Sequence, residues 1–477
     1  MVEPERERDV VYDVDVAVAG GGVAGVFAAL GAARQGAETV LIDRFGYPGG
    51  NIGPGMINAG GIYPKDVTGP SGRPVMTHVY GGLTGIPKEY LDRHAELCGR
   101  SAGNLVNANV ASYLAMKMME EAGVKMLLSA YASDPIMEGN RVTGLFVETK
   151  SGRQAVRAKV VIDATGEADV ARRAGGPVLY PRPEYTEVDH HSPTGAGLYY
   201  TVGGVDSDRW ERAREQQPAE ADLEWAKDTV GTLNERRAYL APHLRRAWEA
   251  DDNRALLGGG LFRMDIDGYG DVSVLDTWPS PDPGIAHRCT GFVRVDMADG
   301  VQVSRAEAVA RMAIFETVEF YRNYVPGFEG AYLLAVAPYF GSRGGPCIEG
   351  EHTVTLDDFE QGRRFPDVLF IFGHVSGGKD VELGHGDWTD LPYRCMLPKE
   401  LAGLIAVGRS ASGIPDTIIR GRTKGMHMGE LGGIAAALSA RNGTTPKALE
   451  VKELQRAAIE AGYYLGDEAR LQELGLA

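Results

Sequence analysis

The segment from Asp15 to Asp43 constrains the fold of this chain more than any other part of the sequence. It begins with a valine-rich stretch typical of a strand, continues into a helix-forming run at Val23–Gln35, and ends in a second strand at Thr39–Ile42. A glycine-rich turn separates the first strand from the helix. This order predicts the first βαβ unit of a Rossmann-type α/β domain built on a parallel central sheet.

Three glycines and one acid make the segment specific. Gly20, Gly22 and Gly25 form a G-x-G-x-x-G motif directly after the strand. The first permits the tight turn, the second lets the backbone approach a pyrophosphate, and the third lets helix and strand pack closely. Asp43 follows Gly25 by 18 positions, close to the ~20 expected of an acid that hydrogen-bonds ribose hydroxyls. The motif therefore predicts a site for the ADP half of a dinucleotide.

Features elsewhere in the chain favour FAD over NAD. Gly50 and Asn51 lie in a glycine-rich turn just after the second strand. A further strand ends at Thr165 and Gly166, and another, Leu404–Ser410, leads toward a glycine-rich helix. The carboxyl ends of parallel strands meet at one edge of a sheet, where open α/β folds bind their ligands. We therefore expect these segments to converge around one cofactor.

Length and composition limit the domain organisation and the partners. A chain of 477 residues should hold two or three domains, and two is the working count. We predict a discontinuous Rossmann-type FAD-binding domain at 1–178 and 346–477, with an inserted α+β substrate or cap domain at 179–345. The net charge of −16 argues against nucleic acid as a partner. No stretch approaches ~18 unbroken apolar residues, so no membrane insertion is expected.

Other local patterns give further predictions. The four cysteines lie far apart and the N-terminus does not read as a secretory signal, so a cytoplasmic location is expected. Ser304 and Glu307 form a capping box, which predicts that the last helix of the insertion begins there and stops before Pro326. We also predict a helix and three strands at about Asn107–Ala122, Lys125–Leu128, Arg141–Glu148 and Val160–Ala164.

Beyond these patterns, the sequence resembles the FAD-dependent oxidoreductase family related to the fumarate reductase and succinate dehydrogenase flavoproteins. The blocks that carry the resemblance are GGGVAGVFAALGAARQGAETVLIDRFGYPGGN, DATGEADVARRAG, VPGFEGAYL, GEHTVTLDDFEQGRRFPD and LPYRCMLPKELAGLIAVGRS. The resemblance implies that FAD is bound by Gly20, Gly22, Gly25, Asp43, Arg44, Gly50, Asn51, Thr165, Gly166, Gly408 and Arg409, with Ala132 near the adenine. It also implies that a helix beginning near Gly425 directs its N-terminus at the flavin.

The substrate side departs from the family pattern. Where relatives carry basic residues, the block GSRGGPCIEG keeps only Arg343. The glycine-rich segment Phe372–Trp388 gathers acids, a lysine and two histidines, His374 and His385. A histidine titrates near neutrality, and an arginine can bind a carboxylate through two hydrogen bonds. The candidate catalytic residues are therefore His374, His385 and Arg343. A polar surface hairpin is the alternative. We predict no metal site, because no compact ligand spacing occurs.

These features together predict an FAD-dependent oxidoreductase. It would transfer a hydride between a small organic substrate and flavin N5, by dehydrogenation or its reverse. The alternatives are a flavin monooxygenase and a flavoprotein that uses FAD for a non-redox hydration or isomerisation. The sequence contains one well-placed G-x-G-x-x-G motif, so a separate NAD(P)H domain is not expected. The substrate, the electron acceptor and the formation of a homo-oligomer are left open.

Overall fold

The computed structural model describes residues 6–56, 66–68, 74–76, 83–98, 107–180, 196–230, 233, 235, 237–252, 264–265, 271–279, 284–292, 296–342, 344–373, 388–414, 418–419 and 421–477. The chain divides into two compact units. Unit 1 comprises Met1–Pro54, Asn58–Asp189 and Gly344–Ala477, and unit 2 comprises Gly55–Ile57 and His190–Arg343. That the FAD-binding domain ends at 178 and resumes at 346 stays a prediction. No helix in the described part of the chain has the length and apolar character needed to cross a membrane.

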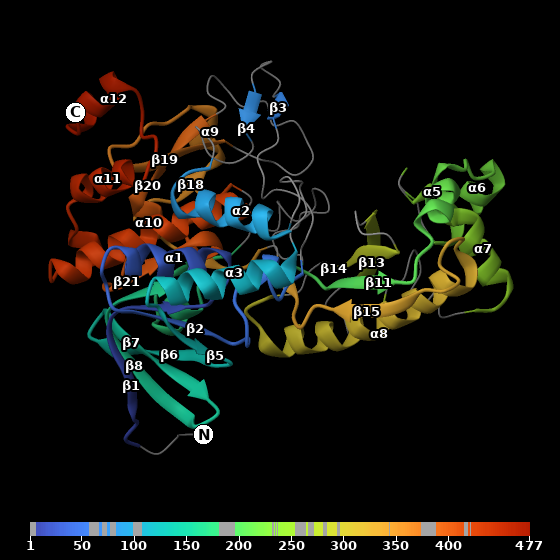
Figure 1. Ribbon diagram of the computed structural model, residues 1–477, viewed down its shortest axis with the longest axis horizontal. Helices are drawn as coiled ribbons and strands as arrows, with labels where there is room; N and C mark the ends of the chain where they lie inside the picture. The colour runs from blue at the N-terminus through green and yellow to red at the C-terminus, as the bar shows by residue number, and fades with distance from the viewer. Residues whose placement is uncertain are drawn as a thin grey trace. The chain divides into compact units, whose positions relative to one another are not determined.

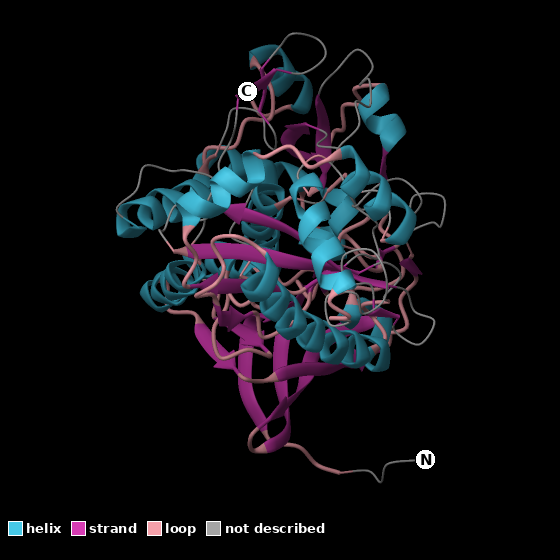
Figure 2. Cartoon of the chain, turned by 90° about the vertical axis from the view of Figure 1, so that its right-hand side faces the viewer, coloured by secondary structure: helices cyan, strands magenta, loops and turns pink. Residues whose placement is uncertain are grey.

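Unit 1 is built on a seven-stranded sheet with the order β5-β2-β1-β8-β7-β6, in which β21 also pairs with β8. Its strands are β1 (Val10–Ala19), β2 (Thr39–Asp43), β5 (Lys125–Leu128), β6 (Tyr131–Glu138), β7 (Arg141–Thr149), β8 (Gly152–Asp163) and β21 (Leu404–Ala406). The strands β5, β2, β1, β8 and β21 are parallel, whereas β6 and β7 are antiparallel additions. The parallel α/β sheet predicted from the sequence is thereby confirmed. In Figure 2 the strands nearest the label N run side by side.

In the view of Figure 1, the labelled helices of unit 1 are drawn above this sheet. The helices are α1 (Val23–Arg34), α2 (Gly85–Cys98), α3 (Ala108–Glu121), α4 (Asp169–Arg173), α9 (Leu356–Glu360), α10 (Arg422–Arg441), α11 (Val451–Glu460) and α12 (Glu468–Leu474). The small sheets pair β3 (Asp66–Thr68) with β4 (Pro74–Met76), β9 (Val178–Leu179) with β17 (Cys347–Ile348), β18 (Val354–Thr355) with β22 (Gly413–Ile414), and β19 (Val368–Gly373) with β20 (Trp388–Pro392).

The two central helices of unit 1, α1 and α10, pack with their backbones in close approach. A Cβ atom built on Gly429 would lie 2.2 Å from the carbonyl oxygen of Ala24, and one built on Gly433 would lie 2.1 Å from that of Ala28. A Cβ on Gly425 would have Val23 as its neighbour, at 3.8 Å. Contacts therefore advance along both helices in the same direction. The helices α1 and α10 run parallel, and their N-termini lie at the same end.

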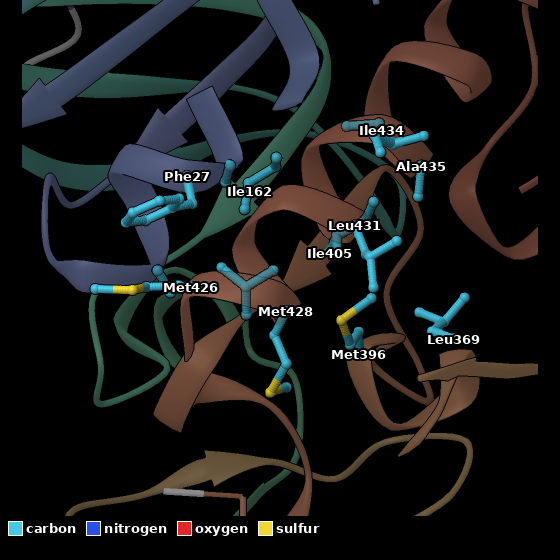
Figure 3. Packing of buried hydrophobic residues seen from close by; sticks show 14 of the residues in the cluster. Phe27, Ile162, Leu369, Met396, Ile405, Met426, Met428, Leu431, Ile434 and Ala435 are labelled. Carbon is cyan, nitrogen blue, oxygen red and sulfur yellow. The ribbon is translucent and has the colours of Figure 1, made fainter. Parts of the chain in front are cut away.

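Apolar side chains from helices and strands fill the space beside this helix pair. Figure 3 shows Phe27 of α1 and Ile162 of β8 on one side and Met426, Met428 and Leu431 of α10 on the other. All five are at most 1% exposed. Because α10 is buried along nearly its whole length, it is a central element of the core and not a surface helix.

In the part of unit 2 that the structure describes, an antiparallel sheet is accompanied by four α-helices. The sheet has the order β12-β13-β14-β10-β16, and β11 pairs with both β14 and β15. Its elements are β10 (Ala196–Gly197), β11 (Tyr199–Gly203), β12 (Met264–Asp265), β13 (Asp271–Pro279), β14 (Ile285–Phe292), β15 (Tyr332–Val336), β16 (Gly341–Ser342), α5 (Ser207–Glu215), α6 (Glu220–Thr229), α7 (Ala241–Glu249) and α8 (Gly300–Tyr324).

One predicted helix start in unit 2 is wrong. The helix α8 begins at Gly300, because the side chain of Asp299 accepts hydrogen bonds from the N–H groups of Val301 and Gln302 and caps the helix there. Ser304 of the supposed capping box therefore lies within the helix. Asp299 and Ser304, five residues apart, can each cap the start of a helix, and the local sequence pattern does not decide between them. The predicted end before Pro326 agrees with the structure.

A buried carboxyl group connects α10 to the start of α2. Glu430 is 3% exposed, and it accepts hydrogen bonds from the N–H of Ile86 (3.1 and 3.2 Å) and from the hydroxyl of Tyr463 (2.7 Å). Burial raises the pKa of Glu430 from 4.5 to about 7, although both hydrogen bonds oppose that rise. An acid whose pKa is raised in the folded state binds its proton more tightly there than in the unfolded chain. Its contribution to stability therefore falls as the pH rises from about 4.5 to about 7.

We expect the Glu430→Gln variant to remove this pH dependence. Between pH 5 and pH 8 the wild-type protein should lose about 2 to 3 kcal/mol of unfolding free energy relative to the variant. Urea unfolding of both proteins at the two pH values measures the difference. The amide keeps an acceptor for Ile86, so the variant should fold. If the unfolding free energies of the wild-type protein and the variant differ by the same amount at both pH values, Glu430 does not titrate in this range.

Candidate dinucleotide-binding site

The predicted convergence of strand ends is confirmed by the register of the sheet in unit 1. Ala19, the last residue of β1, pairs with Ile42 of β2 and with Asp163 of β8. Ala406, the last residue of β21, also pairs with Asp163. The carboxyl ends of four parallel strands therefore lie at one edge, and the turns that follow them meet there.

The first turn has the tight geometry that its glycines predict. Gly20 has φ +96°, and its N–H donates to the carbonyl of Ile42 at 2.8 Å. A Cβ on Gly25 would lie 1.8 Å from the carbonyl oxygen of Gly20, so α1 and β1 meet without room for a side chain. At Gly22, by contrast, the nearest protein atom to a Cβ would be 4.0 Å away. The protein itself does not require glycine at this position, and the open space there suits a ligand.

Two helix N-termini face this region without a capping side chain. The N-cap residue of α1 is Gly22 and that of α10 is Gly421, and in both cases no side chain accepts from the first turn. The first N–H groups of a helix have no partner within the helix, and they carry the positive end of the helix dipole. Because α1 and α10 are parallel, their positive ends lie together. This arrangement fits an anionic group such as a pyrophosphate.

A second turn packs directly against the first. The N–H of Gly49 donates to the carbonyl of Gly21 at 2.8 Å, and a Cβ on Gly50 would lie 2.8 Å from the Cα of Gly22. The hydroxyl of Ser112 on α3 donates to the carbonyl of Pro48 at 2.7 Å, and this hydrogen bond links the turn to α3. Asn51 follows in the short helix η1 (Gly50–Ile52). The structure thus brings Gly50 and Asn51 to the glycine motif, as the sequence predicts.

Asp43 lies at the end of β2, where its carboxylate contacts the first turn. It is 6% exposed, and its Oδ1 accepts from the N–H of Phe45 at 2.9 Å. Burial raises the pKa of Asp43 to about 6, while the hydrogen bonds from Phe45 and Gly21 and the charge of Arg44 oppose the rise. Arg44 itself is exposed, with its guanidinium 4.9 Å from the ring of Phe45.

The third turn, after β8, is organised by Asp163, which sequence reasoning did not select. This residue is fully buried and accepts hydrogen bonds from Thr165, Val170 and Ala171. The hydroxyl of Ser410, in the turn after β21, also donates to it at 3.2 Å and accepts from the N–H of Gly166 at 3.0 Å. Asp163 and Ser410 therefore join two turns that are far apart in the sequence. The sequence feature that could have identified Asp163 is an acid at the end of an apolar strand.

Other predicted cofactor residues lie in or beside these turns. Arg409 donates from Nη2 to Glu167 at 2.7 Å, close to Gly166, and Gly408 has φ +63°. Gly425 lies in the first turns of α10, which begins at Arg422. On β6, the carbonyl of Ala132 accepts a hydrogen bond of 3.0 Å from Arg173. All these residues belong to unit 1, and their contacts with a cofactor stay predictions.

The first two turns of α10 contain two buried polar residues that sequence reasoning missed. The Nζ of Lys424 donates to the carbonyl of Ile418 at 2.6 Å, and the imidazole of His427 bonds the carbonyl of Thr423 at 2.7 Å. Both side chains are fully buried, and burial lowers the pKa of His427 to about 4. His427 is therefore neutral at physiological pH. The sequence feature that could have identified them is a lysine and a histidine within a segment of mostly small or apolar side chains.

The three candidate catalytic residues, His374, His385 and Arg343, lie outside the described residues. Their roles stay predictions. The strands that flank the histidine segment are described, since β19 ends at Gly373 and β20 begins at Trp388.

Gly22 offers a test of ligand binding that is separate from folding. Its backbone is extended (φ −71°, ψ −171°), so alanine fits the backbone and the protein around it. We expect Gly22→Ala to cost about 1 kcal/mol or less in the cofactor-free protein, but to lower FAD affinity at least tenfold because the methyl group fills the ligand's space. Fluorescence titration with FAD and urea unfolding measure the two effects. Gly300→Ala, at a site with no neighbouring atom, is the control. Equal FAD affinity in both variants would contradict the site.

Comparisons with known proteins identify the family of the chain. The sequence profile of the family described as FAD dependent oxidoreductase matches residues 15–457. Among curated proteins, the thiamine thiazole synthase of Pyrobaculum aerophilum is 33% identical over 227 residues, covering 42% of this chain and 78% of that protein. The digeranylgeranylglycerophospholipid reductase 2 of Methanopyrus kandleri is 29% identical over 170 residues, covering 34% of this chain and 40% of that protein.

A solved structure is also similar. The geranylgeranyl bacteriochlorophyll reductase-like protein of Thermoplasma acidophilum aligns over 95% of this chain and 84% of its own, with 16% identity and a TM-score of 0.41.

Proposed function

Because the chain belongs to the FAD-dependent oxidoreductase family, we propose that it transfers a hydride between a small organic substrate and the flavin of its cofactor FAD. The family match extends over residues 15–457 and so includes every turn of the candidate site. The narrower relation to the fumarate reductase and succinate dehydrogenase flavoproteins stays a prediction. So do the substrate, the direction of transfer and the electron acceptor.

One observation supports the position of FAD most directly: the uncapped N-termini of α1 and α10 lie together beside the open position at Gly22. Two positive helix ends at one place favour the pyrophosphate. Asp43 would bind the ribose, and Ala132 would contact the adenine. The remaining residues proposed to hold the cofactor are Gly20, Gly25, Arg44, Gly50, Asn51, Thr165, Gly166, Gly408, Arg409 and Gly425.

The protein would contribute position and proton transfer. FAD supplies the hydride acceptor or donor when it is bound. The N-terminus of α10 would stabilise negative charge on the reduced cofactor through the positive end of the helix dipole. His374 or His385 would accept or donate the substrate proton, and Arg343 would hold a substrate carboxylate. These three roles rest on residue type and on the glycine-rich sequence around the histidines.

Anaerobic reduction of the flavin by candidate substrates tests the proposal. A substrate that bleaches the flavin absorbance identifies the redox half-reaction. In His374→Ala or His385→Ala, we expect at least tenfold slower bleaching with normal FAD content. Lys379→Ala, in the same segment, is the matched control, since lysine does not titrate near neutrality. Unchanged rates in both histidine variants would remove them from the mechanism.

A second candidate is a synthase reaction without net oxidation of the substrate. The observation that favours it is the 33% identity to proteins named thiamine thiazole synthase. Anaerobic turnover without an electron acceptor separates the two functions. Product formation that continues while the flavin stays oxidised would support the synthase, whereas product formation that stops once the bound flavin is reduced would support hydride transfer.

A further inference from the structure

A buried arginine lies inside unit 2, far in sequence from every residue of the proposed FAD site. Arg288 is on β14, directly opposite Tyr200 of β11 in the antiparallel pairing. Opposite residues on neighbouring strands project to the same face of a sheet. Arg288 is 2% exposed and Tyr200 is 1% exposed. Arginine keeps its charge in proteins, so a full positive charge is buried here.

Aromatic rings surround the faces of this guanidinium. Its central carbon lies 3.6 Å from the ring centroid of Tyr321, 4.9 Å from that of Phe328 and 5.7 Å from that of Trp210. Cation–π contacts of this kind stabilise a desolvated cation. They use the face of the guanidinium, so the N–H groups, which lie in its plane, still need hydrogen-bond acceptors.

One edge of the guanidinium is left without a hydrogen bond. Among the residues that the structure describes, neither Nε nor Nη2 of Arg288 has an acceptor, and the hydroxyl of Tyr200 has no partner either. Nε and Nη2 are the two parallel donors with which arginine binds a carboxylate side-on. An unpaired buried charge typically costs several kcal/mol. Within the described part of unit 2, this edge and this hydroxyl are therefore donors without an acceptor, and one small anion would satisfy them.

We propose that unit 2 binds a small carboxylate at this place, with its two oxygens on Nε and Nη2 of Arg288 and a further hydrogen bond from the hydroxyl of Tyr200. Solvent does not reach the donor atoms, so the ligand must be as small as formate or acetate and must displace a neighbouring side chain as it enters. Binding should consequently be slow and should stabilise the folded unit. Arg288 and Tyr200 belong to unit 2, whereas the turns proposed to bind FAD belong to unit 1.

Formate is the probe for this site. Thermal unfolding of the FAD-loaded protein is followed at increasing formate concentration, with chloride keeping the ionic strength constant. In the wild-type protein we expect a saturable rise of the unfolding temperature, and a separate ¹³C-formate NMR signal of the bound ligand should appear, because exchange is slow. In Arg288→Met both effects should be lost. In Tyr200→Phe, which removes one hydrogen bond, half-saturation should need about fivefold more formate.

The matched control is Tyr393→Phe. Tyr393 is also buried, but it lies in unit 1, where its hydroxyl donates to the carbonyl of Pro446 at 3.1 Å, so the formate dependence of this variant should equal that of the wild type. The proposal is overturned if formate and chloride act alike on the wild type, or if Arg288→Met responds as the wild type does. Should Arg288→Met fail to fold, equal half-saturation in Tyr200→Phe and Tyr393→Phe would overturn it.

Discussion

Replacing Asp163 with alanine is expected to lower the unfolding free energy by about 3 to 5 kcal/mol and to abolish FAD binding. The carboxylate accepts from the N–H and hydroxyl of Thr165, from the N–H groups of Val170 and Ala171, and from the hydroxyl of Ser410, at 2.7 to 3.2 Å. Alanine leaves all these buried donors without their acceptor. The turns after β8 and β21 then lose the side chain that joins them.

Urea unfolding and the flavin content of the purified variant measure the two effects. Asp163→Asn should be impaired as well, because its amide N–H₂ would face the N–H of Thr165 or those of Val170 and Ala171. Asp134→Ala is the control. Asp134 forms an exposed ion pair with Arg153, and such pairs are worth up to about 1 kcal/mol. A variant at Asp163 that unfolds within about 1 kcal/mol of the wild type, with FAD bound, would contradict the role we assign to it.

Alanine at Gly433 is expected to destabilise unit 1 by about 3 kcal/mol or more. The new Cβ would lie 2.1 Å from the carbonyl oxygen of Ala28. A backbone atom cannot move aside as a side chain can, so α1 and α10 must separate along their contact. Gly429→Ala should behave alike, since its Cβ would lie 2.2 Å from the carbonyl oxygen of Ala24. Thermal and urea unfolding of the cofactor-free variants measure the loss.

Gly425 provides the control within the same helix. Its Cβ would be 3.8 Å from Val23, an ordinary contact. Since alanine forms helices better than glycine by about 1 kcal/mol, Gly425→Ala should be as stable as the wild type or slightly more stable. If the three variants unfold alike, the close approach of α1 and α10 does not hold the unit together.

The elements with local signals could be predicted from the sequence. The strand β5 has the predicted bounds Lys125–Leu128, and α3 spans Ala108–Glu121 with Asn107 as its cap, within one residue of the prediction. Periodicity and capping act between residues a few positions apart, so the local sequence contains them. The start of α8 was mispredicted, because Asp299 and Ser304 are both good caps and packing selected the first.

Contacts between distant segments could not be predicted. Nothing local shows that Ser410 bonds to Asp163, or that Glu430 accepts from Ile86. Each of these side chains is polar and buried, and its partner is brought to it by the pairing of strands and the packing of helices. The same holds for Arg288 of unit 2, which the structure surrounds with aromatic rings from separate parts of the chain.

By itself, the sequence determined the βαβ start, the glycine turn with Asp43 and the requirement for a dinucleotide, because these depend on spacing within about thirty residues. Only the tertiary structure decided that α1 and α10 are parallel and present two uncapped N-termini at one place. It also decided that Asp163 joins the turns. Those facts depend on backbone approach and on hydrogen bonds between segments more than two hundred residues apart, which exist only once the chain has folded.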